Sequence, residues 1–285
     1  MLRDGLKICF YIRRPDHEVA QAVMSSLEVY LRAVGSHTLG WYFDLEGDLQ
    51  ELDAQGWETN RRHLLSSYWP RIALRDDASN VPGFQFEYYS KAVGTPGPFN
   101  TPDMVNALGF WLPTEFLEEH GPERVRDLAL ELAAQLPFNS GHAGLCFNAM
   151  LGYRETEEEL SRLCLRYPGM DIVEVEGLAI RLGMRVKGPA WMTFLGQPLL
   201  GELGGTEGLR ARLTSPSTTV QPLDSERAVI TLGPWPEAGD TQAGRTLPEY
   251  RELARLLEPW LHHSRGPWPY FPEDIRQRWE RRFLD

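Results

Sequence analysis

Four glycines stand close together in the segment LLGELGGTEGLRARL (199–213), and a glycine-rich turn before a helix can bind phosphate. A P-loop would also need a Lys followed by Ser or Thr, because the Lys reaches the phosphates and the hydroxyl binds magnesium. Neither follows here, and the spacing G-x-x-G-G-x-x-G differs from the dinucleotide fingerprint G-x-G-x-x-G. We therefore expect the glycines to break a helix or to let a bulky neighbour approach, and we predict no nucleotide cofactor. The glycines are Gly201, Gly204, Gly205 and Gly208.

A second candidate for chemistry is the pair His142 and Cys146 in GHAGLCFN, because a histidine beside a thiol lowers the thiol pKa and creates a nucleophile. If the segment is a strand, the two side chains share a face but stand about 13 Å apart, which is beyond hydrogen-bond reach. A buried thiol in a strand is the better interpretation. His262 and His263 lack the neighbouring ligands that a metal site needs, so no metal is predicted.

Acidic residues near His120 are a third candidate, since paired carboxylates can act as general acid and base. We interpret Glu115, Glu118 and Glu119 as the solvated end of a helix. No catalytic residues are predicted. A hydrolase or transferase with an unrecognised carboxylate pair is retained as the alternative function, since any two acids can meet in space.

The composition is that of a globular protein of 285 residues with 42% hydrophobic content, enough for one large core or two smaller ones. The first residues lack the long apolar run of a secretory signal, and no segment is long enough to span a membrane. Three cysteines far apart argue against a disulfide framework. We expect a cytoplasmic protein that binds neither membranes nor, with a net charge of −11, nucleic acid directly.

The negative charge is concentrated in two segments, which we call the first and second acidic blocks. Residues 40–60 carry six acids and no Lys or Arg, and residues 155–176 carry seven acids against two Arg, so that −6 and −5 account for the total of −11. Each block could be an ordinary solvated face, or a surface for a basic partner. The candidate partner-binding residues are Tyr42, Asp44, Glu46, Asp48, Glu51 and Asp53 in the first block, and Glu155, Glu157, Glu158, Glu159, Asp171, Glu174 and Glu176 in the second.

Hydrophobic spacing predicts an α+β fold in which a β-α-β-β-α unit occurs twice, with mixed or antiparallel sheets covered by helices. In the first half, strands 6–13, 84–90 and 105–113 accompany a helix 17–34 that Asp16 would cap. In the second half, strand 188–196 is followed by a helix 197–213 and by a hairpin of strands 218–224 and 227–235. Each half ends with a helix opened by Pro-Glu, at Pro122 and Pro248.

The two halves also resemble each other in sequence. Leu108, Gly109 and Trp111 match Leu232, Gly233 and Trp235 at an offset of 124, and RDLALEL (126–132) matches RELARLL (251–257) at 125. We therefore predict a first half at 1–150 with an acidic insertion near 35–81, an acidic connecting segment at 151–187, and a second half at 188–285. Both acidic blocks lie outside the repeated elements, in connecting segments that often carry binding function.

The C-terminal segment YFPEDIRQRWERRFLD places Ile275, Trp279 and Phe283 at helical spacing, with arginines around them. A basic helix of this kind could bind a membrane or an acidic partner. The narrow apolar stripe favours a helix that packs on the body of the protein.

Several blocks in the second half resemble the bacterial type VI secretion immunity family: GPAWMTFLGQPLLGELGG, ITLGPWPEAGD, LPEYRELARLLEPWL and the closing RRFLD. The resemblance covers most of the chain and is strongest from Arg181 onward. It implies a protein that performs no chemistry itself. Such a protein would bind and neutralise a cognate antibacterial toxin delivered by type VI or another contact-dependent route, in related systems often a nuclease.

A nuclease must present positive charge to phosphates, so the expected partner is a basic toxin, and the two acidic blocks are its predicted contacts. The expected mechanism is occlusion of the toxin active site. An interaction module unrelated to toxins is a further alternative. An enzyme would instead need a deep pocket with converging titratable groups.

Overall fold

The computed structural model describes residues 2–66, 68–95, 97, 100–264 and 272–285. The chain divides into two compact units. The N-terminal unit comprises residues 7–139 and 174–184, and the C-terminal unit comprises residues 1–6, 140–173 and 185–285. Both combine helices with antiparallel strand pairs, which confirms the predicted α+β class.

The strands of the N-terminal unit follow the order β3-β2-β4-β5-β6-β1. The predicted strands at 84–90 and 105–113 are confirmed as β5 and β6, paired so that Phe86 lies opposite Phe110. The bounds are β1 (Leu2–Ile12, of which Lys7 onward lies in this unit), β2 (Trp41–Phe43), β3 (Leu49–Glu51), β4 (Arg71–Arg75), β5 (Gln85–Tyr89) and β6 (Asn106–Pro113).

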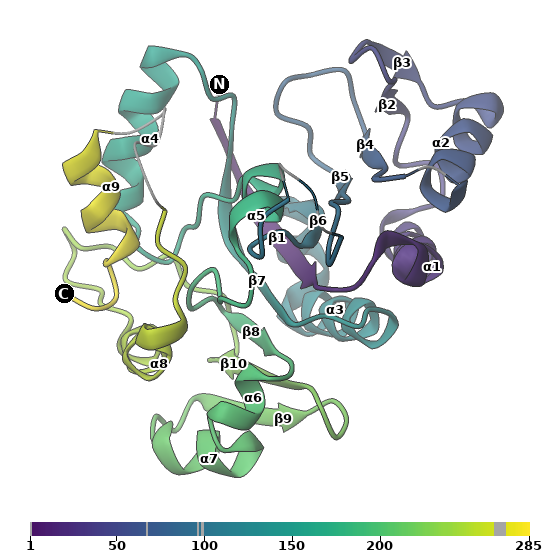
Figure 1. The fold of residues 1–285 in the computed structure, drawn as a ribbon. Coiled ribbons are helices and arrows are strands. Elements are labelled where there is room, and N and C mark those ends of the chain that lie inside the picture. Colours follow the sequence, from purple (N-terminus) through teal and green to yellow (C-terminus); the bar gives the residue numbers. More distant parts are fainter. Residues whose placement is uncertain (1, 67, 96, 98–99, 265–271) are drawn as a thin grey trace. The chain divides into compact units, whose positions relative to one another are not determined.

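Helices cover both faces of β6, which is buried at every position. On one face, α1 and α3 lie side by side, and the ring of Tyr30 from α1 lies 5.4 Å from that of Phe110 (Figure 1). On the other face, α5 packs over β5 and β6, where a Cβ on Gly109 would lie 3.0 Å from Val175. The bounds are α1 (Asp16–Val34), α2 (Ala54–Ser66), α3 (Thr114–Gln135) and α5 (Val175–Arg181).

Two helix starts show how local sequence sets these elements. The helix predicted to open at Pro122 is the second part of α3, which is kinked at Gly121 with a φ of 78°. The predicted N-cap at Asp16 is wrong, because Asp16 is already helical and makes no cap hydrogen bond. Its carboxylate instead accepts a hydrogen bond from the backbone N–H of Trp69.

The strands of the C-terminal unit follow the order β1-β7-β8-β10-β9, with only the first residues of β1 included. The predicted hairpin is confirmed, since Ala228 pairs with Pro222 and the turn between the strands contains Asp224. The bounds are β7 (Ser140–Ala149), β8 (Met192–Leu195), β9 (Thr218–Pro222), β10 (Ala228–Leu232), α4 (Arg154–Arg166), α6 (Leu199–Glu202), α7 (Gly205–Arg212), α8 (Pro248–Leu257), the 3-10 turn Glu258–Trp260 and α9 (Glu273–Glu280).

The glycine cluster interrupts the predicted helix 197–213, which forms as α6 and α7. Gly204 and Gly205 join them with φ angles of 83° and 66°, a left-handed conformation that side chains disfavour. Gly208 lies so close to the chain that a Cβ there would come within 2.4 Å of the Leu203 carbonyl oxygen. The glycines therefore serve the backbone turn and a close approach, as the sequence predicted.

The C-terminal segment packs on its own unit, as its apolar stripe predicted. Trp279 of α9 is buried in a cluster with Leu160 and Cys164 of α4, and α4 and α9 are neighbours in Figure 1. Phe283 is buried in a second cluster with residues of α8. No helix in the described part of the chain is both long and apolar enough to cross a lipid bilayer.

A buried ion cluster fixes the same region. The carboxylate of Asp171 lies 2.9 Å from the Lys187 ammonium and 3.3 Å from the Arg282 guanidinium, and only 14% of its side chain is exposed. Burial alone would raise the pKa of Asp171, but the two cations outweigh burial and hold the pKa at about 2. Arg282 also lies over the ring of Trp279, with 4.2 Å between guanidinium and ring centre.

Replacement of Asp171 by Asn should lower the free energy of unfolding by about 3 kcal/mol near neutral pH, because two cations would remain buried without their carboxylate. A depressed carboxylate pKa stabilises the fold above the unfolded value of about 4, and this stabilisation is lost as the pH falls toward about 2. The difference between parent and Asp171→Asn should therefore shrink over that acidic range. Urea unfolding at a series of pH values measures both effects.

The control is Glu207→Gln, which removes the exposed ion pair with Arg210 and should cost less than about 0.5 kcal/mol. A constant difference between Asp171→Asn and the parent down to the acid limit would contradict the assigned pKa.

Candidate functional site

Three acids of the first acidic block, Asp44, Glu46 and Asp48, lie at the tip of the β2–β3 hairpin, and Asp44 stabilises its turn. The Asp44 carboxylate accepts hydrogen bonds from the backbone N–H groups of Glu46 and Asp48, at 3.1 and 2.8 Å, and from the Gln50 amide at 2.9 Å. These bonds, led by that from Gln50, lower the pKa of Asp44. The turn also needs Gly47, whose φ is 90°. The side chains of Glu46 and Asp48 are exposed, so the turn presents two acids to solvent.

The aromatic residues beside these acids are half-buried. Phe43 lies beneath the Arg75 guanidinium, 4.6 Å from its ring centre. Tyr42 packs close to α2, since a Cβ on Gly56 would lie 3.0 Å from the Tyr42 ring. Trp41 is half-buried as well, so all three aromatic residues of this short strand are partly covered by the protein itself.

The remaining acids of the first block lead into α2. Glu51 is exposed on β3, an edge strand of the N-terminal unit. Asp53 precedes α2, and its carboxylate accepts a hydrogen bond from the Gly56 N–H at 2.8 Å. Asp53 therefore caps α2, and its carboxylate stabilises the helix as well as adding negative charge to the surface.

The second acidic block is divided between the two units. Its first four acids lie on α4 in the C-terminal unit, where Glu155, Glu158 and Glu159 are exposed and Leu160 is buried. The Glu157 carboxylate accepts a hydrogen bond from the Gly152 N–H, and Glu158 pairs with Arg154 at 2.7 Å.

The last three acids of this block are partly buried. Asp171 belongs to the buried ion cluster of the C-terminal unit. Glu174 and Glu176 lie at the start of α5 in the N-terminal unit. Burial raises the pKa of Glu174 despite the opposing charge of Arg181, and Glu176 lies 3.1 Å from Arg71. Most of the exposed charge of the second block is therefore on α4.

Exposed apolar side chains were missed by the sequence analysis. Leu45 stands between the acids at the hairpin tip with 83% of its surface exposed. Tyr68 and Trp69, which precede β4, are also exposed, and Trp69 has a φ of 54°, a rare conformation for a residue with a side chain. Only Leu45 could have been identified from the sequence, because an apolar residue between acids in a turn is unusual.

Two other candidates have structural explanations. His142 and Cys146 are both buried in β7, which confirms the strand interpretation, and all three cysteines are buried thiols outside any disulfide. His262 and His263 follow the 3-10 turn after α8. Within the part of the chain that the structure describes, no group of three or more His, Cys, Asp or Glu is arranged to hold a metal ion.

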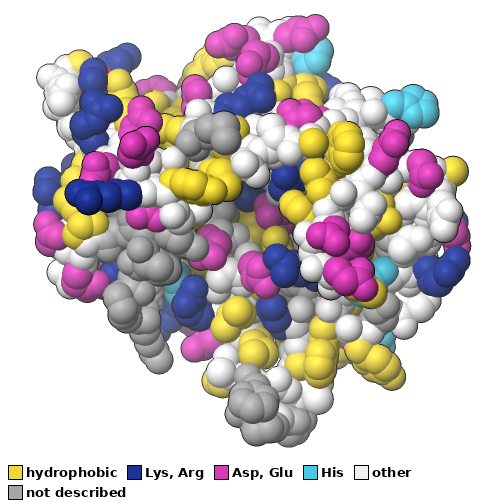
Figure 2. Space-filling view, turned by 90° about the horizontal axis from the view of Figure 1, so that it is seen from above, with side chains coloured by type: hydrophobic (Ala, Val, Ile, Leu, Met, Phe, Trp, Pro, Cys, Tyr) yellow, Lys and Arg dark blue, Asp and Glu magenta, His cyan; other side chains and the backbone are white. Residues whose placement is uncertain are grey.

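The surface charge is mixed where it can be seen. Figure 2 shows Asp and Glu side chains interspersed with Lys and Arg on the visible face, together with apolar side chains. On this face, a charged partner would therefore meet local groups of acids rather than a uniformly acidic surface.

The family model TsiV, described as type VI immunity for VRR-NUC, matches residues 22–283. Among solved structures, the Pseudomonas aeruginosa T6SS protein PA0821 is similar, with a TM-score of 0.79 and 19% identity over 99% of this chain and 84% of that chain. At this identity the likeness shows a shared fold. None of the curated proteins matches the chain. Because the family model spans nearly the whole chain, the protein belongs to the type VI immunity family for VRR-NUC, and it protects against a nuclease effector without being an enzyme.

Proposed function

We propose that the protein neutralises its VRR-NUC effector by binding over the nuclease active site and excluding DNA. A nuclease needs a positive surface to bind phosphates, so the partner surface is basic. The observation that carries the proposal is the β2–β3 tip, where Asp44 holds the turn while Glu46 and Asp48 remain exposed around Leu45. An apolar side chain ringed by acids suits a basic protein partner. The cytoplasm, where incoming nuclease would meet DNA, is the compartment in which this protection is needed.

We rank the other predicted toxin contacts by how much of each side chain is exposed. Glu51 extends the acidic tip along β3, and Glu155, Glu158 and Glu159 supply a second acidic surface on α4. Tyr42, Asp53, Glu157, Glu174 and Glu176 are candidate contacts whose side chains also bond or pack within the protein. Asp171 is the weakest candidate, because its charge is already paired with Lys187 and Arg282.

We further infer an internal duplication with the boundaries expected from the sequence: 1–150 with an insertion near 35–81, a connecting segment 151–187, and 188–285. In the N-terminal unit the strand order is β5-β6-β1, and in the C-terminal unit it is β9-β10-β8. The order of these elements along the chain is also similar in the two units. In the N-terminal unit it is β1, α1, β5, β6, α3, and in the C-terminal unit it is β8, α6 with α7, β9, β10, α8.

The duplication predicts that these two sets superpose, with β1 on β8 and β6 on β10. The measurement is the root-mean-square distance of equivalent Cα atoms. A best superposition that places β1 on any strand other than β8 would make the sequence repeat a coincidence.

The double substitution Glu46→Lys with Asp48→Lys should slow association with the effector about tenfold at low salt, because exposed charges act mainly on the encounter rate. The deficit should shrink as salt is raised, since ions screen exposed charges. Asp44 is left unchanged so that the turn keeps its shape. Stopped-flow or biolayer measurements with a catalytically inactive effector give the rates.

The matched control is Glu119→Lys with Glu226→Lys, which changes the net charge equally at exposed positions outside both acidic blocks. Equal association rates for the two double variants at low salt would show that the hairpin acids are only a solvated face.

The double substitution Glu155→Lys with Glu159→Lys tests the α4 surface separately. We expect association to slow about three- to tenfold, with the same dependence on salt. Protection of bacteria that express the effector provides a second measurement. If this variant matches the Glu119→Lys, Glu226→Lys control while the hairpin variant is slow, α4 is not part of the interface.

A further inference from the structure

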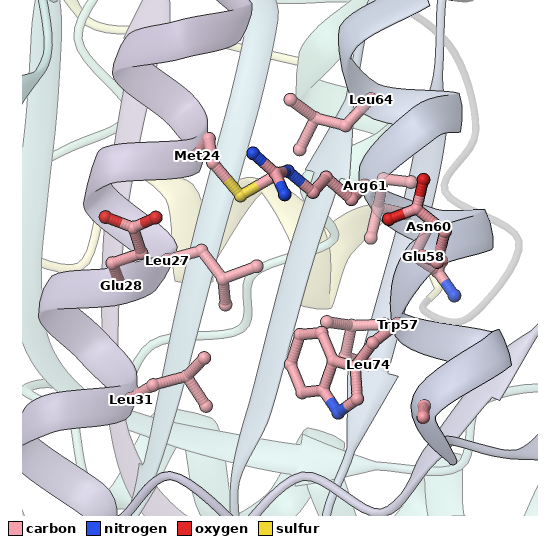
Figure 3. Close-up of a pocket in the computed structure, with 12 residues that line it drawn as sticks. Met24, Leu27, Glu28, Leu31, Trp57, Glu58, Asn60, Arg61, Leu64 and Leu74 are labelled. Atoms are coloured by element: carbon pink, nitrogen blue, oxygen red, sulfur yellow. The ribbon is translucent and has the colours of Figure 1, made fainter.

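The N-terminal unit contains a cavity between α1 and α2, above β4. Its volume is about 380 Å³, within the size range of ligand pockets and much larger than the voids of a packed interior. Figure 3 shows Leu27 and Leu31 of α1 facing Trp57 of α2 across the opening. The walls are mainly apolar, so an empty pocket of this size leaves apolar surface uncovered.

The mouth of the pocket carries charges from both helices. Glu28 of α1 is exposed and has no ion-pair partner among the described residues. Glu58 of α2 lies 3.6 Å from Arg62, and Arg61 extends from α2 toward Met24 of α1 in Figure 3. A partner with a basic group beside an apolar group would therefore find both an unpaired carboxylate and an apolar wall.

Part of the pocket wall comes from residues of the first acidic block. Ala54 lines it and is the first residue of α2, directly after Asp53. Glu51 precedes these residues on β3 and is exposed. Because the same block supplies exposed acids and part of the pocket wall, one partner can contact both.

We propose that the α1–α2 pocket receives an apolar side chain of the nuclease effector, with a Lys or Arg beside it that pairs with Glu28. This inference rests on the proposed function, because it takes the occupant from the same basic partner. A buried apolar anchor surrounded by charged contacts is the usual arrangement of an interface hot spot. The anchor would supply affinity, and the acids of the first block would guide the encounter.

The first test fills the pocket with Ala54→Trp. A bulky ring at the mouth should compete with the effector side chain and weaken the equilibrium affinity about 30-fold, the size of a hot-spot effect. The matched control is Thr59→Trp, which adds a similar ring to an exposed position of α2 outside the pocket lining. Calorimetric titration of inactive effector gives both affinities, and circular dichroism checks that each variant is folded.

The second test reverses the charge at the mouth with Glu28→Lys, which should weaken binding about tenfold. Glu18→Lys, on the same helix but outside the pocket lining, is its control and should bind like the parent.

The third test uses the parent protein and does not depend on how a variant folds. Among the seven methionines, Met24 lines the pocket, so its ¹³C-labelled methyl group reports occupancy directly. The Met24→Leu variant assigns its signal. Addition of inactive effector should shift this signal at the same molar ratio that saturates binding.

Two results would overturn the pocket assignment and leave the proposed function standing. In the first, the effector binds the parent tightly but the Met24 methyl signal does not shift. In the second, Ala54→Trp binds the effector with the same affinity as Thr59→Trp. Failure of the parent to bind the effector overturns both. Native mass spectrometry tests another occupant. A small apolar molecule that copurifies with the parent, is absent from Ala54→Trp and stays bound in the effector complex would assign the pocket to that molecule instead.

Discussion

The burial of β6 on both faces is the constraint on which the N-terminal unit depends. Side chains alternate along a strand, so Phe110 faces Tyr30 of α1 while Gly109 faces Val175 of α5. A sheet with two apolar faces must be covered twice, because either face exposed to water would forfeit its hydrophobic stabilisation. The second cover cannot come from neighbouring sequence, since α1 and α3 both lie on the first face. It comes from residues 174–184, which are remote in the chain.

This cover explains how the acidic residues are distributed. The chain leaves the C-terminal unit after Val173, so Glu174 and Glu176 accompany α5 into the N-terminal unit, while the acids of α4 and Asp171 remain behind. One acidic run in the sequence therefore becomes three different environments. On α4 the carboxylates face water, at Asp171 the carboxylate joins a buried ion cluster, and at Glu174 burial raises the pKa.

Sequence reasoning identified the elements whose signal is local. Strands β5 and β6 were predicted from aromatic and aliphatic residues, β10 from its place in a hairpin with a turn at Asp224, and α8 begins at the proline that predicted it. The elements α2 and α5 were not predicted. Only three of the thirteen residues of α2 are buried, and α5 spans seven residues whose position is set by contact with a distant strand. The α1–α2 pocket could not be predicted from the sequence either, because it forms only where two helices pack against each other.

The acidic blocks also show why counting charges predicts a surface incompletely. Asp has one methylene, so its carboxylate readily reaches backbone N–H groups nearby, as Asp44 does in its turn and Asp53 does before α2. Glu46, Glu155 and Glu159 reach further from the backbone and are exposed. The division is not absolute, since Asp48 is exposed and Glu157 holds the Gly152 N–H. Aspartates thus mainly stabilise the turns and helix starts, and glutamates carry most of the exposed charge. The negative charge that a partner can reach is therefore smaller than the net charge of −11 and more local.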